Sequence, residues 1–354
     1  MILIRADGNA AIGAGHLMRC LTIADAVEQS WERVLFVCAD EDSAAFAGHR
    51  YYRTHVLHTD YRHPETELQT RDDGGSAWQE LMEDVRVQDG EAVTILVDSY
   101  YVTEKYLESL RRFGRVFLME DTPREKGKER IFYPADGLIN YNLFARQEGY
   151  EAAEDRYPAG IYLGGSYIPI RPQFLDRGRR IRQQVRDVLI TTGGGDAENI
   201  AGRILRRLWR KDWRFHVVSG GFNPHMEELK RMALEMGGIR VYKDVTDMAS
   251  LMENCDLAVT AGGTTVYELC ALGIPFVCFS CAANQEALAE YVEPQGLGLS
   301  AGAWHLAAEE TLEAVAAKAG TLAGNAALRE ACSARERAAV DGRGAERIAR
   351  LLLG

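Results

Sequence analysis

The chain has 354 residues, which is long for one compact core, so its length favours two domains. Its net charge of −11 excludes a surface built for nucleic acid, because such a surface would repel the phosphates. No apolar run approaches the ~18 residues that a membrane-spanning helix needs. Met1 leads directly into an apolar run without a signal-peptide pattern. We therefore expect a cytoplasmic protein with no membrane partner, and we expect a monomer.

The first half of the chain alternates short apolar runs with amphipathic stretches. This alternation is typical of a parallel sheet that is covered by helices on both faces. The predicted strands lie in 1–4 (MILI), 33–39 (RVLFVCA), 92–100 (AVTILVDSY), 115–121 (RVFLMED) and 137–142 (GLINYN), and predicted helices include 16–30 and 104–113. A stretch from Tyr150 that is rich in Gly, Pro and charge then breaks the rhythm, and we interpret its end as a linker.

The alternation of strands and helices starts again after this linker. It runs through 187–208, 215–221, 239–245, 256–273 and 275–280, and the C-terminal third is helical. We expect the α/β class, with two doubly wound Rossmann-like domains facing a central cleft. The predicted boundaries are 1–172 for the N-terminal domain, 173–335 for the C-terminal domain and 336–354 for a last helix, which would pack back on the N-terminal domain.

Three glycine-rich turns follow predicted strands. In open parallel sheets ligands bind beyond the carboxyl ends of the strands, where glycines let a phosphate approach the backbone and the next helix N-terminus. None of the turns is a Walker loop or a G-x-G-x-x-G fingerprint, and such turns also occur without a ligand. The glycines predicted to contact a ligand are Gly13, Gly15, Gly193, Gly194, Gly262 and Gly263.

The third turn, TAGGTTVYE, carries further polar side chains. Thr264 and Thr265 can cap the following helix and donate to a phosphate, and Glu268 can accept hydrogen bonds from a ribose diol. The alternative for Glu268 is a solvated helix carboxylate. Asn284 and Gln285 follow another strand at the same edge, and their amides suit the hydroxyl and acetamido groups of a sugar. The alternative for Asn284 is helix capping alone.

Three other patterns have simpler explanations than a metal or redox site. Cys278 and Cys281 form a C-x-x-C without a second pair, which indicates buried thiols at a strand end. The histidines of THVLHTDYRH indicate a surface loop. The acidic run 40–42 indicates a solvated strand end. We therefore expect no metal and no cofactor.

Nine motifs together resemble one enzyme family and occur in its order along nearly the whole chain. They are RADGNAAIGAGHLMRCLTIADAV, LVDSYYV, LMEDTP, INYNLFA, YLGGSYIPIRPQF, TTGGGD, AGGTTVYELCALGIP, ANQ and VDGRGAERI. The resemblance is to the bacterial hydrolases of pseudaminic acid biosynthesis, which act on UDP-2,4-diacetamido-2,4,6-trideoxy-β-L-altropyranose. That family is similar to GT-B glycosyltransferases, including the enzyme that adds N-acetylglucosamine to lipid I.

The resemblance implies metal-independent hydrolysis of the C1–O bond of a UDP-sugar, with inversion. It implies that His16 is the catalytic base, since an imidazole at a helix N-terminus stays neutral and can accept a proton from water. It further implies catalytic roles for Tyr100, for Asp98 two residues before it, and for Asn284. Ser99 departs from the residue that some relatives have there.

Several alternatives stay open from the sequence. Arg19 either orients the site, pairs with the diphosphate or is a surface charge. The same nucleotide site would serve a GT-B glycosyltransferase that uses an acceptor, a UDP-sugar 2-epimerase or a UDP-sugar sensor without catalysis.

Overall fold

The computed structural model describes residues 1–9, 14–58, 76–85, 91–122, 132–177, 181–193, 195–220, 223–243 and 245–354. The chain divides into two compact units. The first consists of Met1–Arg171 together with Arg343–Gly354, and the second is Pro172–Gly342. From the sequence, these boundaries were expected after residues 172 and 335.

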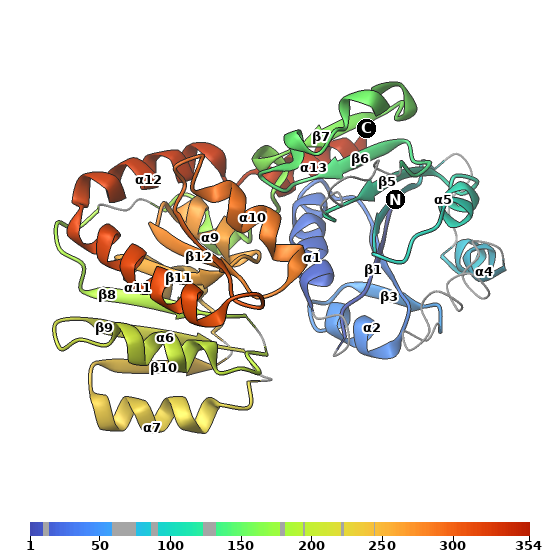
Figure 1. Cartoon of the computed structure of the whole chain (residues 1–354). Coiled ribbons are helices and arrows are strands. Elements are labelled where there is room, and N and C mark those ends of the chain that lie inside the picture. Colours follow the sequence, from blue (N-terminus) through green and yellow to red (C-terminus); the bar gives the residue numbers. More distant parts are fainter. Residues whose placement is uncertain are drawn as a thin grey trace. The chain divides into compact units, whose positions relative to one another are not determined.

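The first unit is built on a parallel sheet with strand order β3-β2-β1-β4-β5-β6-β7 (Figure 1). The strands are β1 (Ile2–Ala6), β2 (Val34–Cys38), β3 (Arg53–Val56), β4 (Thr94–Asp98), β5 (Arg115–Met119), β6 (Gly137–Asn140) and β7 (Gly160–Leu163). Every residue of β1, β2 and β4 is buried, as expected for central strands with helices on both faces. Strand β7 lies inside the stretch that was interpreted as irregular before the linker, so that interpretation was wrong there.

Helices connect the strands of the first unit. The described helices are α1 (Gly15–Glu28), α2 (Glu41–Gly48), α4 (Ser76–Asp84), α5 (Glu104–Leu110) and α13 (Gly344–Leu353), with short 3₁₀ turns η1 (Ala145–Gln147), η2 (Glu151–Arg156) and η3 (Gly165–Tyr167). Two of them, α2 and α5, begin with a capping side chain. The side chain of Asp40 accepts a hydrogen bond from the backbone of Ser43 at 2.7 Å and so caps α2. The acidic run 40–42 therefore contains a helix cap.

The C-terminal helix α13 belongs to the first unit, where it lies along α1 (Figure 1). Its first residue, Gly344, packs directly on the backbone of η3: a Cβ built there would lie 2.5 Å from the nitrogen of Ile168. Only a glycine allows this approach. The predicted helix 336–354 is in fact two elements, because the preceding helix continues to Ala339 in the second unit.

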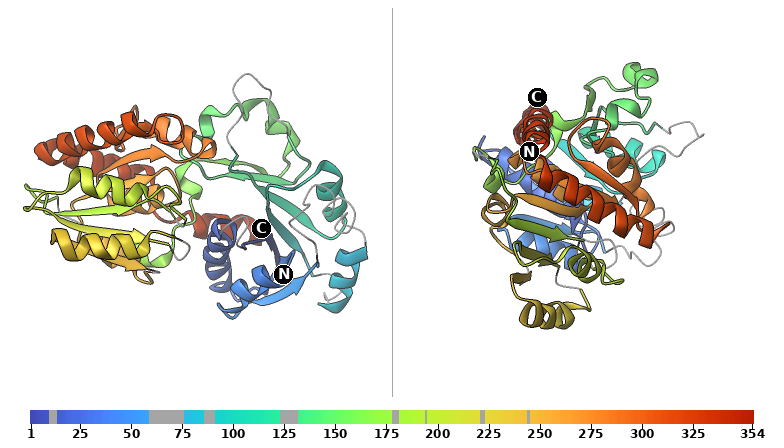
Figure 2. Two further views of the ribbon diagram at one scale, coloured as in Figure 1. Left: turned by 60° about the horizontal axis from the view of Figure 1, so that its bottom comes forward. Right: turned by 60° about the vertical axis from the view of Figure 1, so that its left-hand side comes forward.

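The second unit has a parallel sheet with strand order β10-β9-β8-β11-β12-β13, and helices lie on both of its faces (Figure 2). Its strands are β8 (Asp187–Thr191), β9 (Arg214–Ser219), β10 (Ile239–Lys243), β11 (Leu257–Ala261), β12 (Phe276–Ser280) and β13 (Leu299–Ala303). Its helices are η4 (Pro172–Phe174), α6 (Ile200–Leu208), α7 (Met226–Met236), α8 (Met248–Glu253), α9 (Thr265–Leu272), η5 (Ala283–Gln285), α10 (Glu286–Val292), α11 (Ala308–Gly324) and α12 (Ala326–Ala339).

Both sheets reverse their strand order at one point. In the first unit this point lies between β1 and β4, which pair in register from Ile2 with Thr94 to Ala6 with Asp98. In the second unit it lies between β8 and β11. In doubly wound sheets the carboxyl ends of the two strands at such a reversal form the usual ligand-binding position.

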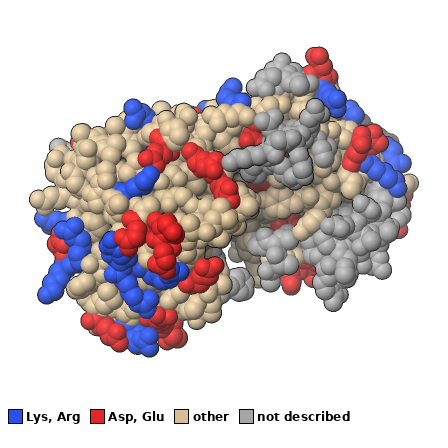
Figure 3. Space-filling model, viewed as in Figure 1, with Lys and Arg blue, Asp and Glu red and all other residues tan. Residues whose placement is uncertain are grey.

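The charged surface of the second unit mixes both signs. Figure 3 shows Lys and Arg side chains intermixed with Asp and Glu side chains on one face. Arginines of α6 pair with glutamates of α11 and α7: Arg203 with Glu309, Arg207 with Glu313, and Arg206 with Glu228. Exposed pairs of this kind add little to the stability of a fold, because water and salt screen them. In the described ranges, no helix combines the length and the apolar character that a membrane crossing requires.

Candidate active site

Four polar side chains of the first unit meet at the carboxyl ends of its central strands. His16 lies in the first turn of α1, which follows β1, and Asp98 is the last residue of β4. Asp121 follows β5 and Tyr141 follows β6. Because these strands are parallel neighbours, their carboxyl ends lie at one edge of the sheet and bring residues far apart in sequence into contact.

His16 and Asp98 form a direct, buried contact. The Nδ1 atom of His16 lies 2.7 Å from Oδ1 of Asp98. Nη2 of Arg19 also lies 2.8 Å from Nδ1, but Asp98 is the shorter contact, and an ionised carboxylate only accepts hydrogen bonds, so we assign the proton of the neutral imidazole to Nδ1. The lone pair is then on Nε2, which makes no hydrogen bond within the described part of the chain. The contact therefore presents the basic nitrogen of His16 away from the carboxylate.

Arg19 lies against His16 and bridges the carboxylates of Asp98 and Asp121. Its Nε donates to Oδ2 of Asp98 at 2.5 Å, and its Nη2 donates to Oδ1 of the same side chain. Its Nη1 donates to Oδ2 of Asp121 at 2.5 Å and also to the hydroxyl of Tyr141, whose ring lies 5.1 Å from the guanidinium carbon. Arg19 is buried, so the open choice about this residue is decided against a surface charge.

Asp98 is ionised although it is fully buried. Burial opposes its ionisation, but the nearby charge of Arg19 and the contact with His16 outweigh this effect and hold its pKa well below the ordinary range. Burial, and then the negative charge of Asp98, raise the pKa of the Cys20 thiol, which donates to Oδ2 of Asp98 at 3.3 Å. The acceptor positions of Asp98 are therefore all used by donors.

The ring of Tyr100 packs against the imidazole of His16. The two rings meet edge to face, with 4.4 Å between the centroids. The Tyr100 side chain is 52% exposed, and its hydroxyl lies 3.5 Å from Oδ2 of Asp121. Burial and then the charge of Asp121 raise the pKa of Tyr100, so the phenol keeps its proton and can donate to a ligand.

The second unit brings its predicted residues to one edge of its own sheet. They follow β8, β11 and β12, which are parallel neighbours. Gly193 has a φ of +94°, a backbone conformation that would be strained in a residue with a side chain. The amide of Gly262 donates to the carbonyl of Phe279 at 2.8 Å, and a Cβ on this glycine would lie 3.1 Å from the carbonyl oxygen of Gln285. Gly262 therefore lets the β11 turn lie against the β12 turn.

The start of α9 differs from one expectation. Thr264 occupies the N-cap position, but its side chain makes no capping hydrogen bond, so its predicted capping role was wrong. Its backbone is already helical, with φ −58° and ψ −23°, whereas a capping side chain needs an extended backbone. Thr265 is the first helical residue, Glu268 lies in the first turn, and Gly263 has open space around its Cα.

Asn284 lies exposed in η5 and makes no hydrogen bond to the described residues. The N-cap positions of η5 and α10 belong to Ala282 and Gln285, so the alternative that Asn284 serves as a helix cap is wrong. The side chain of Gln285 instead accepts a hydrogen bond from the amide of Cys281 at 2.9 Å, which ties the turn together.

For the remaining predicted glycines of the first two turns, the described part of the structure shows no feature that requires a glycine. Gly13 and Gly194 lie outside the described residues. Gly15 is the first residue of α1, and nothing lies within 4 Å of the position that a Cβ would occupy there, so no close approach explains this glycine.

Two residues of the cluster were not singled out from the sequence. Asp121 ends the motif LMED, two residues after the end of β5, and Tyr141 lies in INYN, directly after β6. The sequence signal that could have identified both residues is their position, because each is a polar side chain just beyond the carboxyl end of a parallel strand.

The cysteine pair lies in and after β12. Burial raises the pKa of the Cys281 thiol to about 12, and burial also raises the pKa of Cys278. Because metal binding and redox exchange need the thiolate, these environments disfavour both.

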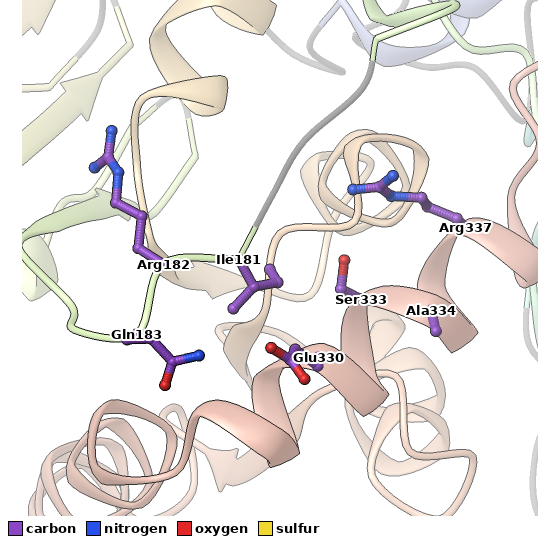
Figure 4. Close-up of a pocket in the computed structure, with 7 residues that line it drawn as sticks. All are labelled: Ile181, Arg182, Gln183, Glu330, Ser333, Ala334 and Arg337. Atoms are coloured by element: carbon purple, nitrogen blue, oxygen red, sulfur yellow. The ribbon is translucent and has the colours of Figure 1, made fainter.

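A hollow of about 770 Å³ opens elsewhere in the second unit (Figure 4). It is lined by Ile181, Arg182, Gln183, Glu330, Ser333, Ala334 and Arg337. The guanidinium of Arg182 points away from Gln183 and Glu330 and donates to Asp187 at 3.1 Å. The hydroxyl of Ser333 donates to the carbonyl of Gly273 at 2.7 Å, so these polar groups serve the fold.

Comparisons with known proteins agree with this architecture. Residues 186–325 match the family model described as glycosyl transferases group 1. The chain is 25% identical over 319 residues to the spore coat polysaccharide biosynthesis protein SpsG of Bacillus subtilis, covering 87% of this chain and 86% of that protein. It is 22% identical over 298 residues to the UDP-2,4-diacetamido-2,4,6-trideoxy-β-L-altropyranose hydrolase of Campylobacter jejuni, covering 83% and 97%.

Among solved structures, MurG of Acinetobacter baumannii superposes with a TM-score of 0.69 at 14% identity, covering 99% of both chains. This likeness confirms the expected GT-B fold class of two parallel-sheet α/β units. The relative from Campylobacter jejuni carries the name of the family that the sequence motifs resemble, so the resemblance is confirmed.

Proposed function

We propose that the chain hydrolyses the C1–O bond of UDP-2,4-diacetamido-2,4,6-trideoxy-β-L-altropyranose and releases UDP and the free sugar with inversion at C1. The observation that carries the proposal is the buried contact of His16 with Asp98, which leaves a basic Nε2 at the carboxyl edge of the first sheet. The named hydrolase among the relatives supplies the substrate class.

In the proposed reaction His16 takes a proton from a water molecule through Nε2. The water oxygen bonds to C1 on the face opposite UDP, and the bond between C1 and the phosphate oxygen breaks with its electron pair leaving on UDP. Asp98 keeps the imidazole in the Nδ1–H tautomer and stabilises the imidazolium that forms. Tyr100, as a protonated phenol beside the imidazole, would donate to the sugar or to the water.

We assign nucleotide binding to the second unit. The amides at the start of α9 would stabilise the charge that develops on the leaving diphosphate. Glu268 in that first turn would accept from the ribose, and Asn284, exposed and without a partner in the described chain, would hold the acetamido sugar. Gly193, Gly262 and the hydroxyl of Thr264 would line the phosphate site.

The experiment follows the UDP-sugar by proton NMR with purified protein, EDTA and no acceptor. We expect the inverted free sugar as the first product, and we expect His16→Ala to lower kcat on the order of 10²–10⁴-fold. His216→Ala is the matched control, because His216 is also buried and lies 3.0 Å from a carboxylate, Asp187, but in the second unit. A retained configuration, or equal loss in both variants, would contradict the proposal.

A second candidate is a glycosyltransferase that uses the same groups with an acceptor alcohol. The match of residues 186–325 to the glycosyl transferase family model favours it. UDP release that depends on an added acceptor would select this function, and tight binding without turnover would select a UDP-sugar sensor.

A further inference from the structure

Asp121 contacts both Arg19 and Tyr100, two side chains that lie against His16. Its Oδ2 lies 2.5 Å from Nη1 of Arg19, 3.1 Å from the hydroxyl of Tyr141 and 3.5 Å from the hydroxyl of Tyr100. Its backbone carbonyl accepts from Nδ2 of Asn142 at 2.9 Å. The Asp121 carboxylate is therefore held at the ends of β5 and β6, where it contacts both Arg19 and Tyr100.

The charges of this cluster explain why a second carboxylate is needed. Arg19 approaches Nδ1 of His16 to 2.8 Å, and a positive charge so close opposes a proton on the imidazole. With His16 neutral, Asp98, Asp121 and Arg19 sum to −1, and an imidazolium brings the sum to zero. Without Asp121, the pair of Asp98 and Arg19 is already neutral, and an imidazolium would leave a buried excess of positive charge.

We propose that Asp121 is a positioning residue for the base: it holds Arg19 in its bridging place and offsets its charge, so that His16 can accept the proton from water. The inference rests on the proposed function, in which His16 is that base. Among the described residues, the charged or titratable groups in direct contact with His16 are Asp98, Arg19 and Tyr100, and Asp121 contacts two of these.

The test compares Asp121→Asn with Asp121→Glu. Asparagine keeps an oxygen acceptor for Arg19 but removes the charge, whereas glutamate keeps the charge. A unit charge one side chain removed from an imidazole, at an effective dielectric constant near 20, changes the proton affinity of the imidazole by on the order of tenfold to fiftyfold. We expect kcat of Asp121→Asn to fall by that factor with KM changed less than about threefold, and we expect Asp121→Glu to recover part of kcat.

Asp136→Asn is the matched control. Asp136 lies before β6, pairs with Arg111 at 2.8 Å and accepts from the amide of Val116, so it stabilises the same strands away from His16. We expect it to lower stability but to leave kcat unchanged. An equal fall of kcat in Asp121→Asn and Asp136→Asn would assign Asp121 a merely structural role and would overturn the inference.

A readout without turnover separates this inference from the proposed function. In ¹⁵N-histidine-labelled protein, the His16 resonances are identified by their loss in His16→Ala. At about pH 6, the imidazolium fraction of His16 should be lower in Asp121→Asn than in the wild type. If the wild type releases no UDP, the proposed function fails while this comparison still stands, and an unchanged His16 titration would overturn the inference by itself.

Discussion

Replacing Asp98 by asparagine tests the central contact, because neither orientation of the amide fits. An amide nitrogen in the place of Oδ1 would face Nδ1 of His16 and a donating nitrogen of Arg19. In the place of Oδ2 it would face Nε of Arg19, which now lies 2.5 Å from that oxygen. Each orientation therefore sets two donors against each other and leaves the buried guanidinium without its main counter-charge.

The expected loss of stability is large. Removing one partner of a buried charge pair costs about 3–5 kcal/mol, and in Asp98→Asn the guanidinium of Arg19 keeps only Asp121 as a counter-charge. A loss of that size makes unfolding of the first unit on the order of a hundredfold to several thousandfold more frequent. Arg19→Gln in the same background removes the stranded charge, so the double variant should lose less than the sum of the two single losses, by about 0.5–3 kcal/mol.

Amide hydrogen exchange is the suitable assay because the two units can unfold separately, so a single melting temperature is not a defined quantity. The slowest-exchanging amides of β1 and β4 report on the first unit, and those of β8 and β11 serve as the internal control. We expect faster exchange in β1 and β4 alone. Protection in Asp98→Asn within about threefold of the wild type, or strictly additive losses in the double variant, would refute the reasoning about a buried, ionised Asp98.

Two further predictions concern the first unit. The pKa of Asp98 lies below its ordinary value of 3.8, so its carboxylate stabilises the fold above about pH 4 and loses this contribution as the pH falls further. Between about pH 5 and 3, the protection of the β1 amides, corrected for the intrinsic exchange rate at each pH, should fall more in the wild type than in Asp98→Asn. Gly344→Ala should destabilise the unit by about 1–3 kcal/mol, because the new methyl group meets the backbone of Ile168. In an exchange experiment α13 and α1 should lose protection together, whereas Gly320→Ala, with nothing within 4 Å, should not lower stability.

The strands that were predicted from the sequence are mostly those buried on both faces, such as β1, β4 and β11. The strands that were not singled out, β3, β7 and β13, all lie at sheet edges. Their residues are mainly half-buried, so they do not form a continuous apolar run. The missing signal thus has a physical origin, since an edge strand is covered less completely than a central one.

The candidate site was predictable only in part for a related reason. His16 and Asp98 stand in motifs that resemble a known family, and Arg19 was considered as a residue that orients the site, pairs with the diphosphate or is a surface charge. Asp121 and Tyr141 belong to the cluster only because β5 lies beside β4 and β6 lies beside β5, and no spacing in the sequence states that order. Their contacts with Arg19 are tertiary, so they emerge only when the sheet order is known.

The return of α13 to the first unit has a consequence for synthesis of the chain. A ribosome produces Met1–Arg171 first, then the whole of Pro172–Gly342, and only then the helix that lies along α1. The second unit is continuous and can complete its sheet during translation. The first unit must wait for residues 343–354, so the helix that carries His16 lacks its neighbour until α13 has been synthesised. A released fragment that ends before residue 344 should therefore hold a complete second unit and an incomplete first one.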